Sequence, residues 1–523
     1  MKRLSLFVAS ILLHLLLIPA ETHSQTRYDS VVPAMSATLQ LLASPDFEGR
    51  EAGSRGGNLA AEYIASRMMH AGLKPYSLPE KNLGIQLSDY FQPFQLIRFS
   101  IVNASLEIQG SEGNPKYKIQ SNSGFSVEDA YESLSGSFPL IFAGYGIQVP
   151  SIGYNSYSGL DVKGKIVLLM EGYPGAGDTL SETWKLIRKT AGDDSFDIEK
   201  RCKLADSLGA LAVIILKENL WNKGIRDIYT EDLLDFCSEN TPYQDAEFLV
   251  PGKKPEHDLP CFYPGLNQGI GIFRTAGFSS TILMDLSKGI NIKVSDLRPR
   301  KIKLNLAVTK DTITICNVAG ILKGVDTTQT IIIGAHYDHL GKRGDLTYYG
   351  SDDNASGTTG LLTLADLISK NGVKPAVNIV FGSWTAEEKG LIGSEYFASK
   401  LTNPDKIRMY LNMDMISRSA PEDTVARIIS VGTRTSDQYL RDLANKTNTT
   451  LIHPFSLDLW DVTGHSGSDY ASFRDKGIPV MTFFSGFHND YHTPCDIPSK
   501  ADFSKMKDIL SIVEGCVKEM MKQ

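Results

Sequence analysis

The sequence predicts an α/β fold in which a mixed β-sheet is flanked by helices. Short continuous apolar runs are typical of strands that are buried on both faces of a sheet. Segments with helical periodicity lie between these runs. The chain of 523 residues, 42% of them hydrophobic, is long enough for a large core and more than one domain. The four runs that define the sheet are residues 330–333, 377–384, 407–413 and 478–484.

The chain begins with a segment that is typical of a secretory signal peptide. Lys2 and Arg3 precede an apolar stretch from Leu4 to Pro19, and a more polar segment comes next. This stretch is short for a membrane-spanning helix. We therefore expect residues 1–25 to be a signal peptide and the mature chain to be exported, periplasmic or extracellular, without a stable membrane span. An uncleaved anchor is the alternative.

Helices are predicted near both ends of the remaining chain. Residues 30–75 have a helical pattern, in which Ala60, Ile64 and Met68 recur on one face. The last segment, residues 503–522, is amphipathic, and we expect its apolar face to pack on the sheet.

The middle of the chain predicts a separate, β-rich domain. Its apolar runs are again short and continuous, and a helix is expected at residues 198–208, before the third run. The predicted strands are residues 139–147, 164–170 and 210–216.

Acidic and imidazole side chains follow the four strands of the predicted sheet. The carboxyl ends of strands in an open α/β sheet face one crevice, so these side chains are expected to converge there. Imidazole and carboxylate are ordinary zinc ligands, and one carboxylate can bridge two metals, which favours a pair of zinc ions. The candidates are His336, Asp353, Glu387, Glu388, Asp414 and His492.

Two neighbouring positions refine this prediction. Asp338 lies two residues after His336, so in an extended segment it points to the same side and could fix the tautomer of a metal-bound imidazole. Glu387 and Glu388 are adjacent and cannot aim at the same atom. One of them is expected to be a ligand and the other a general base that moves a proton from water to the leaving amine.

Five motifs in this order make the prediction more specific: AHYDHLG, SDDNASG, WTAEEKGLIGS, LNMDM and DYHTP. Together they resemble the co-catalytic dinuclear zinc aminopeptidases of the peptidase family M28. That family also contains glutamate carboxypeptidase, glutaminyl cyclases and the transferrin receptor. The resemblance covers roughly residues 330–495 and implies a zinc-exopeptidase (phosphorylase/hydrolase-like) fold. The earlier stretch SPDFEGREAGSRG resembles the opening of the same family.

The resemblance implies a role for each candidate residue. Glu387 would be the general base, and Tyr491 would donate a hydrogen bond to the developing oxyanion. The chain departs from the family pattern at Tyr470, where a histidine often follows the Ser-Asp pair. Polar structural or rim roles are expected for His339, His453, His465 and His488. By the same resemblance, His336 and Asp414 would hold one zinc, Glu388 and His492 the other, and Asp353 would bridge them.

The middle domain resembles a protease-associated domain, a small β-rich module without catalytic groups of its own. The runs FAGYGIQVP, GLDVKGKIVLLMEG and KLADSLGALAVII are the basis of this resemblance. It implies that the peptidase domain is interrupted by an insert. The predicted parts are a signal peptide at 1–25, the N-terminal part of the peptidase domain at 26–130, the protease-associated-like insert at 131–295 and the zinc peptidase catalytic domain at 296–523.

Charge and cysteine content limit the classes of partner. The net charge of -7 and the lack of a basic run argue against nucleic acid as a partner. The six cysteines follow no zinc-finger spacing. In an exported chain Cys237 and Cys261 are a candidate disulfide pair, although spacing alone does not fix the pairing.

We expect an exported aminopeptidase with two Zn²⁺ ions that acts on peptides with free N-termini. The first alternative is a glutaminyl cyclase-type acyltransferase, in which the substrate's own amine replaces water. Release of a C-terminal residue is a second, and a non-catalytic receptor-like binding protein is a third. The complete set of ligands favours hydrolysis over a binding protein, and the sequence leaves side-chain preference and oligomeric state open.

Overall fold

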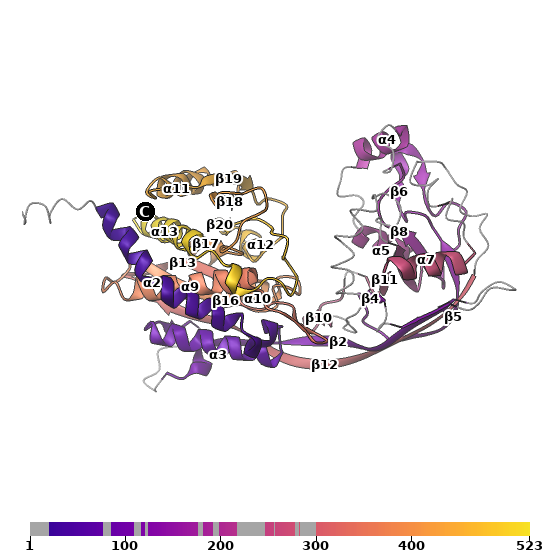
Figure 1. Cartoon of the computed structure of the whole chain (residues 1–523), viewed down its shortest axis with the longest axis horizontal. Helices are drawn as coiled ribbons and strands as arrows, with labels where there is room; N and C mark the ends of the chain where they lie inside the picture. Colours follow the sequence, from indigo (N-terminus) through magenta and orange to yellow (C-terminus); the bar gives the residue numbers. More distant parts are fainter. Residues whose placement is uncertain are drawn as a thin grey trace, which may run out of the picture. The chain divides into compact units, whose positions relative to one another are not determined.

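The structure is a computed structural model of the chain (Figure 1). It describes residues 20–76, 85–108, 117–120, 124–175, 181–191, 198–216, 246–255, 257–277, 282 and 300–522. Most of the expected signal peptide, residues 1–19, lies outside the described residues, and helix α2 begins at Ala20. In the part of the chain that is described, no helix combines the length and the apolar character needed to cross a membrane.

The chain divides into two compact units. Unit 1 comprises residues 1–94, 314–342 and 346–523, and unit 2 comprises residues 95–313 and 343–345. These boundaries differ from the expected ones near residues 130 and 295. The reason is that strands β2 (Phe91–Ile108) and β12 (Arg300–Leu322) each run from one unit into the other, so the division falls inside a strand. Neither hydropathy nor composition changes at such a point.

Unit 1 contains the sheet that the apolar runs predict. Strand β13 pairs in parallel with β16 on one side and with β17 on the other, and β20 pairs in parallel with β17. The edges are mixed, because β12 is antiparallel to β16 and β18 is antiparallel to β20. The strands of this sheet are β1 (Lys74–Pro75), β13 (Asp326–His336), β16 (Val377–Trp384), β17 (Ile407–Met413), β18 (Ile428–Thr433), β19 (Ser456–Asp461) and β20 (Val480–Phe484), together with part of β12. Strands β14 (Gly341–Arg343) and β15 (Leu346–Tyr348) form a separate two-stranded sheet.

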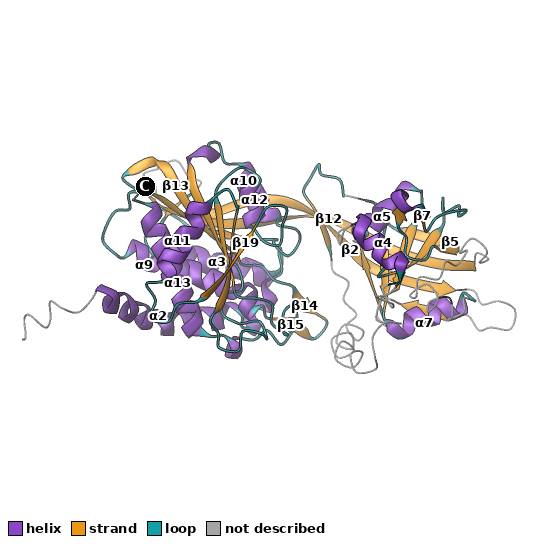
Figure 2. Cartoon of the chain, turned by 90° about the horizontal axis from the view of Figure 1, so that it is seen from above, coloured by secondary structure: helices purple, strands orange, loops and turns teal. Residues whose placement is uncertain are grey.

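Helices cover both faces of this sheet, which confirms the predicted α/β fold (Figures 1 and 2). The helices are α2 (Ala20–Leu42), α3 (Arg55–His70), α9 (Gly357–Ser369), α10 (Ile392–Ser399), α11 (Gln438–Asn448), α12 (Tyr470–Arg474) and α13 (Phe503–Met520). Shorter helical turns are Pro45–Arg50, Leu87–Tyr90, Ser351–Ser356, Pro404–Lys406 and Pro498–Lys500. The expected helical region 30–75 is thus two helices with a break between them.

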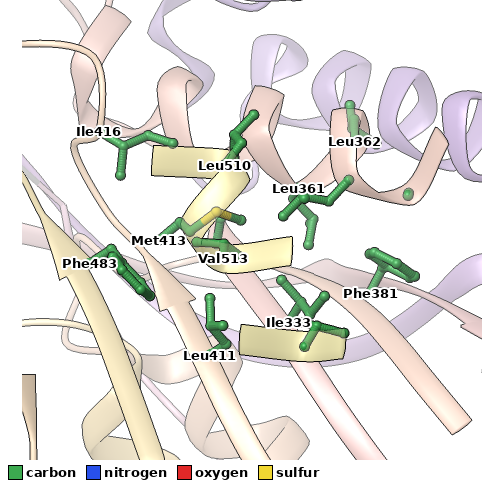
Figure 3. Close-up of a cluster of buried hydrophobic side chains, with 14 of the residues drawn as sticks. Ile333, Leu361, Leu362, Phe381, Leu411, Met413, Ile416, Phe483, Leu510 and Val513 are labelled. Carbon is green, nitrogen blue, oxygen red and sulfur yellow. The ribbon is translucent and has the colours of Figure 1, made fainter. Parts of the chain in front are cut away.

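The alternation of side chains along β13 produces two cores. Ile331 and Ile333 point to the face covered by α2, α3, α9 and α13, whereas Ile332 points to the face covered by α10 and α12. Figure 3 shows the first of these cores, where Leu361 of α9 and Val513 of α13 lie over the strands. Burial on both faces explains why these strands are mainly apolar.

Unit 2 is a mixed sheet with helices. Strands β5, β8, β9 and β11 pair in parallel in this order, and β4 is antiparallel to β11. The first predicted strand ends at Phe142 rather than residue 147, because Gly144 and Gly146 have φ of +57° and +67°. The elements are β3 (Tyr117–Gln120), β4 (Phe125–Glu128), β5 (Leu134–Phe142), β6 (Gln148–Val149), a helical turn (Pro150–Ile152), β7 (Tyr154–Asn155), β8 (Ile166–Met170), α4 (Glu182–Ala191), α5 (Ile198–Ser207), β9 (Ala212–Leu216), β10 (Glu247–Leu249), β11 (Cys261–Pro264) and α7 (Leu266–Thr275).

Candidate metal centre

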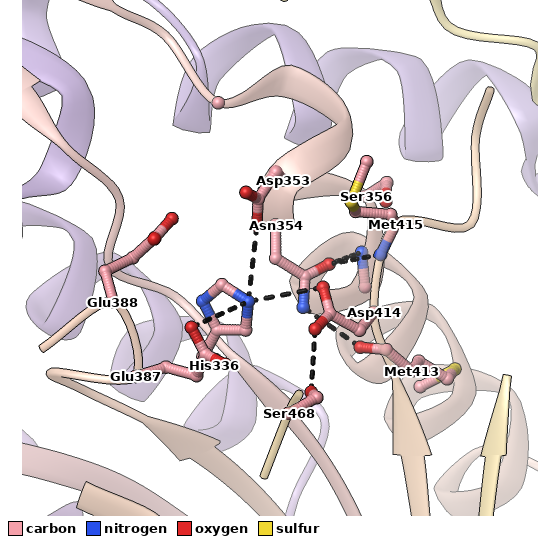
Figure 4. A network of polar contacts seen from close by, with 12 residues as sticks. His336, Asp353, Asn354, Ser356, Glu387, Glu388, Met413, Asp414, Met415 and Ser468 are labelled. Carbon is pink, nitrogen blue, oxygen red and sulfur yellow. Dashed lines mark hydrogen bonds and ion pairs between the residues drawn. The ribbon is translucent and has the colours of Figure 1, made fainter. Parts of the chain in front are cut away.

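The candidate residues meet at the carboxyl ends of the central strands of unit 1, and Figure 4 shows His336, Asp353, Glu387, Glu388 and Asp414 there. His336 is the last residue of β13, and Asp414 directly follows β17. Glu387 and Glu388 follow the end of β16 within four residues. Because β13 is parallel to both β16 and β17, these three strand ends lie side by side.

Two groups of possible metal ligands form there, and they share one carboxylate. The first group is His336, Asp353 and Asp414. The Nε2 atom of His336 lies 3.4 Å from Oδ1 of Asp353 and 3.3 Å from Oδ1 of Asp414. The other oxygen of Asp414 accepts a hydrogen bond of 2.7 Å from the Ser468 hydroxyl, which orients the carboxylate.

The second group is His339, Asp353, Glu388 and His492. The Nε2 atom of His492 lies 3.1 Å from Oδ2 of Asp353 and 3.2 Å from Oε2 of Glu388. The Nδ1 atom of His339 lies 2.6 Å from Oε1 of Glu388. Asp353 therefore presents one oxygen to each group, which is the arrangement that a bridging carboxylate requires.

His339 is the residue of this centre that the sequence analysis did not place in it. Its side chain is fully buried inside the second group and does not lie at a rim. Strand periodicity does not predict this position, because residues three apart on a strand point to opposite sides. The strand ends at His336, however, and the turn after it brings His339 to the same centre. A His-x-x-His spacing beyond a strand end is the signal that could have found it.

The predicted contact of Asp338 with the His336 ring is made by the backbone carbonyl rather than by the carboxylate. Its carboxylate lies 3.8 Å from Nδ1 of His336, whereas its backbone carbonyl accepts from that nitrogen at 3.2 Å. The carbonyl therefore keeps the proton on Nδ1 and leaves Nε2 free to bind a metal. The carboxylate instead accepts hydrogen bonds from the backbone N–H groups of Glu387 and Glu388, at 3.1 and 3.4 Å. Asp338 thus fixes the turn that presents both glutamates.

The two adjacent glutamates have opposite proton affinities. Burial raises the pKa of Glu387 well above its ordinary value, and the carboxylates of Asp469 and Asp414 add to the shift against the effect of His336. Burial also acts to raise the pKa of Glu388, but contacts with His339 and His492 outweigh it and lower that pKa to about 2. Glu388 is therefore held as an anion, while Glu387 can take up a proton. Such a separation is typical of an acid–base pair with divided roles.

The backbone around Asp353 is held by side chains from distant segments. The Asn354 amide donates to the Met413 carbonyl at 3.0 Å and accepts from the Met415 N–H at 3.3 Å, so it is hydrogen-bonded to the backbone on both sides of Asp414 (Figure 4). Oδ2 of Asp496 accepts from the N–H of Asp353 at 3.2 Å. The position of the shared carboxylate is thus fixed relative to β17 before any metal binds.

Left-handed backbone conformations occur at three positions of the centre. Ala386, Met415 and His492 have φ of +55°, +52° and +55°. Ala386 precedes Glu387, Met415 follows Asp414, and His492 is itself a candidate ligand. Positive φ is costly for residues with a side chain and is found mainly where function requires it. These conformations aim Glu387, Asp414 and His492 at one point.

Arg50 connects the N-terminal helices with the loops of the centre. The side chain is fully buried, and it donates to the carbonyls of Leu42, Tyr337, Tyr349 and Gly350 at 2.7 to 2.8 Å. Tyr337 follows His336, and Gly350 precedes the segment that contains Asp353. Burial lowers the pKa of Arg50 to about 10, although Asp353 and other carboxylates oppose the shift. The sequence analysis did not identify this residue.

The composition of the centre fits bound cations. Burial acts to lower the pKa of His492, but Asp353 and Glu388 outweigh it and raise it to about 10, which shows how anionic the surroundings are. Buried carboxylates in excess of cationic groups are costly unless positive charge compensates them. Imidazole nitrogens and carboxylate oxygens are suitable zinc ligands, and Asp353 can serve two ions. The carboxylates are Asp338, Asp353, Glu387, Glu388 and Asp414, against three histidines and Arg50.

A cavity of about 290 Å³ opens next to this centre. Its wall includes Glu387, Asp353 and Tyr491, whose ring stacks on His492 with 3.8 Å between the ring centroids. Burial raises the pKa of Tyr491, and the carboxylates of Asp353 and Glu388 raise it further, so the hydroxyl keeps its proton. The apolar and aromatic part of the wall consists of Met415, Trp460, Tyr470, Phe484, Phe487 and Tyr491.

The profile of the peptidase family M28 matches residues 317–517, which include every residue of the two ligand groups. The matched segment begins near the division between the units and ends within α13.

Curated relatives match a similar part of the chain. The leupeptin-inactivating enzyme 1 of Streptomyces exfoliatus is 30% identical over 195 residues, which are 33% of this chain and 41% of that protein. The probable leucine aminopeptidase 2 of Aspergillus oryzae is 31% identical over 216 residues, 40% of this chain and 41% of that protein. The chain thus spans less than half the length of the curated relatives that it matches.

Solved structures resemble the fold over most of the chain. An aminopeptidase from Aneurinibacillus sp. strain AM-1 has a TM-score of 0.59 and 21% identity, with 93% of each chain covered. A zinc aminopeptidase from Bacillus subtilis has a TM-score of 0.57 and 20% identity, with 93% of this chain and 95% of that chain covered. At this level of identity the likeness shows a shared fold.

Proposed function

We propose that the protein is an exported zinc aminopeptidase that removes the N-terminal residue from peptides, and the match of residues 317–517 to the peptidase family M28 profile supports this. The observation that supports this most strongly is the position of Asp353, which offers one carboxylate oxygen to each of two groups of ligands. The leucine aminopeptidases among the relatives support the choice of an aminopeptidase. The zinc aminopeptidase among the solved structures supports the choice of metal.

The proposed ligands belong to the two groups. His336 and Asp414 would hold one zinc ion, Glu388 and His492 the other, and Asp353 would bridge them. In this proposal His339 is a positioning residue, because its Nδ1–H donates to Glu388 and fixes the direction of that carboxylate.

Glu387 is the proposed general base. It does not belong to either group of ligands, yet its Oε2 atom lies 3.8 Å from Nε2 of His336 and its side chain lines the cavity. Bound zinc would polarise the scissile carbonyl and acidify a water molecule. The Glu387 carboxylate takes the proton from the attacking water and passes it to the nitrogen of the leaving amine. The Tyr491 hydroxyl donates a hydrogen bond to the oxygen that becomes negative.

The cavity suggests the preferred substrate. Its aromatic wall lies beside Glu387 and Asp353, so the side chain of the first residue would contact Trp460, Phe484 and Phe487. A large apolar side chain would bury the most surface there, at about 25 cal/mol per Å² of apolar area. We therefore propose leucine or an aromatic residue at the N-terminus of the substrate.

For the N-terminal segment and the middle of the chain, the proposals rest on the sequence. The basic start and the apolar stretch up to Pro19 support export to a periplasmic or extracellular location. The glycine-rich runs of residues 131–295 support a protease-associated-like insert without catalytic groups.

Synthetic peptides test this proposal directly. The zinc-loaded chain is incubated with peptides that have free, acetylated or glutamine N-termini, and the product masses are followed. Stepwise loss of residues from free N-termini alone is expected. Ammonia loss from the glutamine peptide without shortening would indicate a cyclase, and shortening from the other end would indicate a carboxypeptidase. No change in any peptide would contradict an enzymatic function.

A pair of variants assigns the chemistry to Glu387. Glu387→Gln should lower kcat by about 10² to 10⁴-fold, the range for loss of a general base, while the zinc content stays the same. Glu422→Gln, an exposed glutamate of the same unit, should leave both quantities unchanged. Equal activity of the two variants would contradict the role of Glu387.

A further inference from the structure

Two cysteines of unit 2 lie against each other in its interior. Cys202 is part of α5, and Cys261 is the first residue of β11. Their Sγ atoms are 2.9 Å apart, and the residues are 1% and 0% exposed. Non-bonded heavy atoms usually pack at about 3.5 to 4.0 Å, so the two sulfur atoms are closer than an ordinary contact. We propose that Cys202 and Cys261 form a disulfide bond in the functional protein.

A neighbouring histidine raises the question of whether the pair binds a metal instead. His257 lies close enough to both sulfur atoms to complete a three-ligand group. Its Nδ1 atom, however, accepts a hydrogen bond of 3.3 Å from the Leu259 N–H, so the ring proton is on Nε2. That nitrogen faces Oδ2 of Asp129 at 3.5 Å. Both ring nitrogens are thus engaged, and neither has a lone pair for a cation.

The surroundings of the sulfur atoms also favour a neutral pair. Apart from His257, the cluster that contains both cysteines is apolar and includes Val167, Val213 and Ile215. The contact with Cys202, together with burial, raises the pKa of Cys261 well above its ordinary value. Metal binding requires thiolates, and a tetrahedral zinc ion with Zn–S bonds of about 2.3 Å would hold its sulfur ligands about 3.8 Å apart. A disulfide bond, in contrast, carries no charge and requires the two sulfur atoms to be close together.

The oxidation needs a partner of defined chemistry. The two thiols lose two protons and two electrons as the S–S bond forms. A disulfide oxidant, either a protein disulfide or a small-molecule one, accepts them and is reduced to two thiols, through a mixed disulfide. Because both sulfur atoms are buried in the folded unit, the exchange takes place before the unit closes. An exported chain folds where such oxidants are present.

The expected disulfide differs from the pair suggested by spacing. Cys237, the other member of that pair, lies outside the described residues, whereas Cys261 contacts Cys202. The bond would join residues 59 positions apart and tie α5 to β11. Closing a loop of this length restricts the unfolded chain, and for a unit of this size its loss should lower Tm by about 10 °C.

Peptide mapping of the unmodified full chain tests the proposal without a variant. The chain is folded in the presence of oxidised glutathione, its free thiols are alkylated under denaturing conditions, and the proteolytic peptides are weighed before and after reduction. The expected product is one cross-linked pair that contains Cys202 and Cys261. Alkylation of both residues, or a link from Cys237 to either, would overturn the proposal.

Metal binding is tested in the same experiment. The folding is repeated with zinc present and then with a chelator, and the cross-linked pair is expected in equal yield in both. A link that forms only with chelator would show that zinc holds the thiols, and would overturn the proposal.

Cys495→Ser, which removes an exposed cysteine of unit 1, should leave the link and the Tm of unit 2 unchanged, whereas Cys202→Ser should abolish the link. The result does not depend on aminopeptidase activity, so the two proposals fail separately.

Discussion

The two units have similar frameworks but differ at the ends of their strands. Each contains four strands paired in parallel, β16, β13, β17 and β20 in unit 1 and β5, β8, β9 and β11 in unit 2. In unit 1 the strands lead into His336, Asp414 and the glutamate pair. In unit 2, β5 leads into Ala143 and Gly144, β8 into Glu171 and β11 into Gly265, so these three ends offer one carboxylate and no histidine. A parallel sheet offers a place for chemistry, and the residues at the strand ends determine whether chemistry occurs there.

The buried polar groups of the two units also differ, in the charge that they carry. The centre in unit 1 has five carboxylates against three histidines and Arg50, a composition that suits bound cations. In the described part of unit 2, the group of possible ligands is Cys202, His257 and Cys261, which can satisfy one another as neutral groups. Unit 1 is therefore expected to depend on metal, and unit 2 on oxidation.

The strongest test of this comparison changes one carboxylate at a strand end in each unit. Asp414→Asn, directly after β17, should lower metal affinity by more than about 100-fold and abolish activity, because a proposed ligand is lost. Glu171→Gln, directly after β8, is the matched change in unit 2 and should alter neither quantity. Metal content after dialysis and peptide hydrolysis measure both effects. Similar metal loss in the two variants would contradict the assignment of the centre to unit 1.

A change at Arg50 should destabilise unit 1 and leave the stability of unit 2 unchanged. Arg50→Met leaves four carbonyls without their donor, three in buried contacts and one in a partly buried contact. A single unsatisfied buried group costs about 1 to 3 kcal/mol, so we expect unit 1 to lose about 3 kcal/mol or more. Hydrogen exchange of the β13 and β8 amides reports the two units separately. Exchange should become faster in β13 and stay the same in β8.

The control for Arg50 is an arginine of unit 2 with an exposed ion pair. Arg98 contacts Asp311 at 2.6 Å, but the two side chains are 37% and 51% exposed. Arg98→Met should therefore cost less than about 1 kcal/mol. An equal loss of stability in both variants would show that the carbonyl contacts of Arg50 do not matter.

These residues also show how far sequence reasoning reaches. His336 and Asp414 could be predicted, because a buried strand is visible as a mainly apolar run and each of these residues stands where such a run ends. His339 could not be placed by strand periodicity, because the chain turns after His336. Arg50 could not be placed either, because its partners lie up to 300 positions away in sequence. Local patterns contain no information about such contacts.

The unit boundaries and the thiol pair illustrate the same limit. The divisions at residues 94 and 313 fall within β2 and β12, whose patterns continue across them. Cys202 and Cys261 meet because α5 packs on the strands of unit 2, which the spacing of cysteines cannot reveal. Features set by neighbouring residues could be predicted, whereas features set by packing between distant segments could not.

A third prediction compares the two ends of strand β13. Asp338, beyond its carboxyl end, holds the backbone of Glu387 and Glu388, so Asp338→Asn should lower metal affinity or kcat by about 10 to 100-fold. Asp326, at its amino end, accepts from the Thr328 N–H at 2.8 Å, and Asp326→Asn should have no such effect. Metal titration and peptide hydrolysis of both variants measure the difference. An effect of equal size at the two ends would mean that the position on the strand is irrelevant.

The smallest expected effect concerns a carboxylate of unit 1 that has its own partner. Asp423 accepts from Lys505 Nζ at 3.0 Å and from the backbone N–H of Arg427 and Ile428, and both side chains of the ion pair are at most 1% exposed. Burial acts to raise the pKa of Asp423, but these hydrogen bonds outweigh it and lower the pKa to about 2. Because the pKa is lower in the folded state, the stabilisation is complete above about pH 4 and is lost as the pH falls towards 2.

Asp423→Asn should therefore cost about 2 kcal/mol at pH 6, and the difference from the unchanged chain should narrow between pH 4 and pH 2. Burial also lowers the pKa of Lys505, so the cost of burying the ammonium offsets part of this gain. Urea unfolding at each pH, with a chelator present, isolates the pair from the metal centre. The unfolding is then repeated with zinc in place of the chelator. If the difference in unfolding free energy between Asp423→Asn and the unchanged chain depended on zinc, the comparison of Asp423 with the metal centre would be contradicted, because a carboxylate paired within the chain should need no metal.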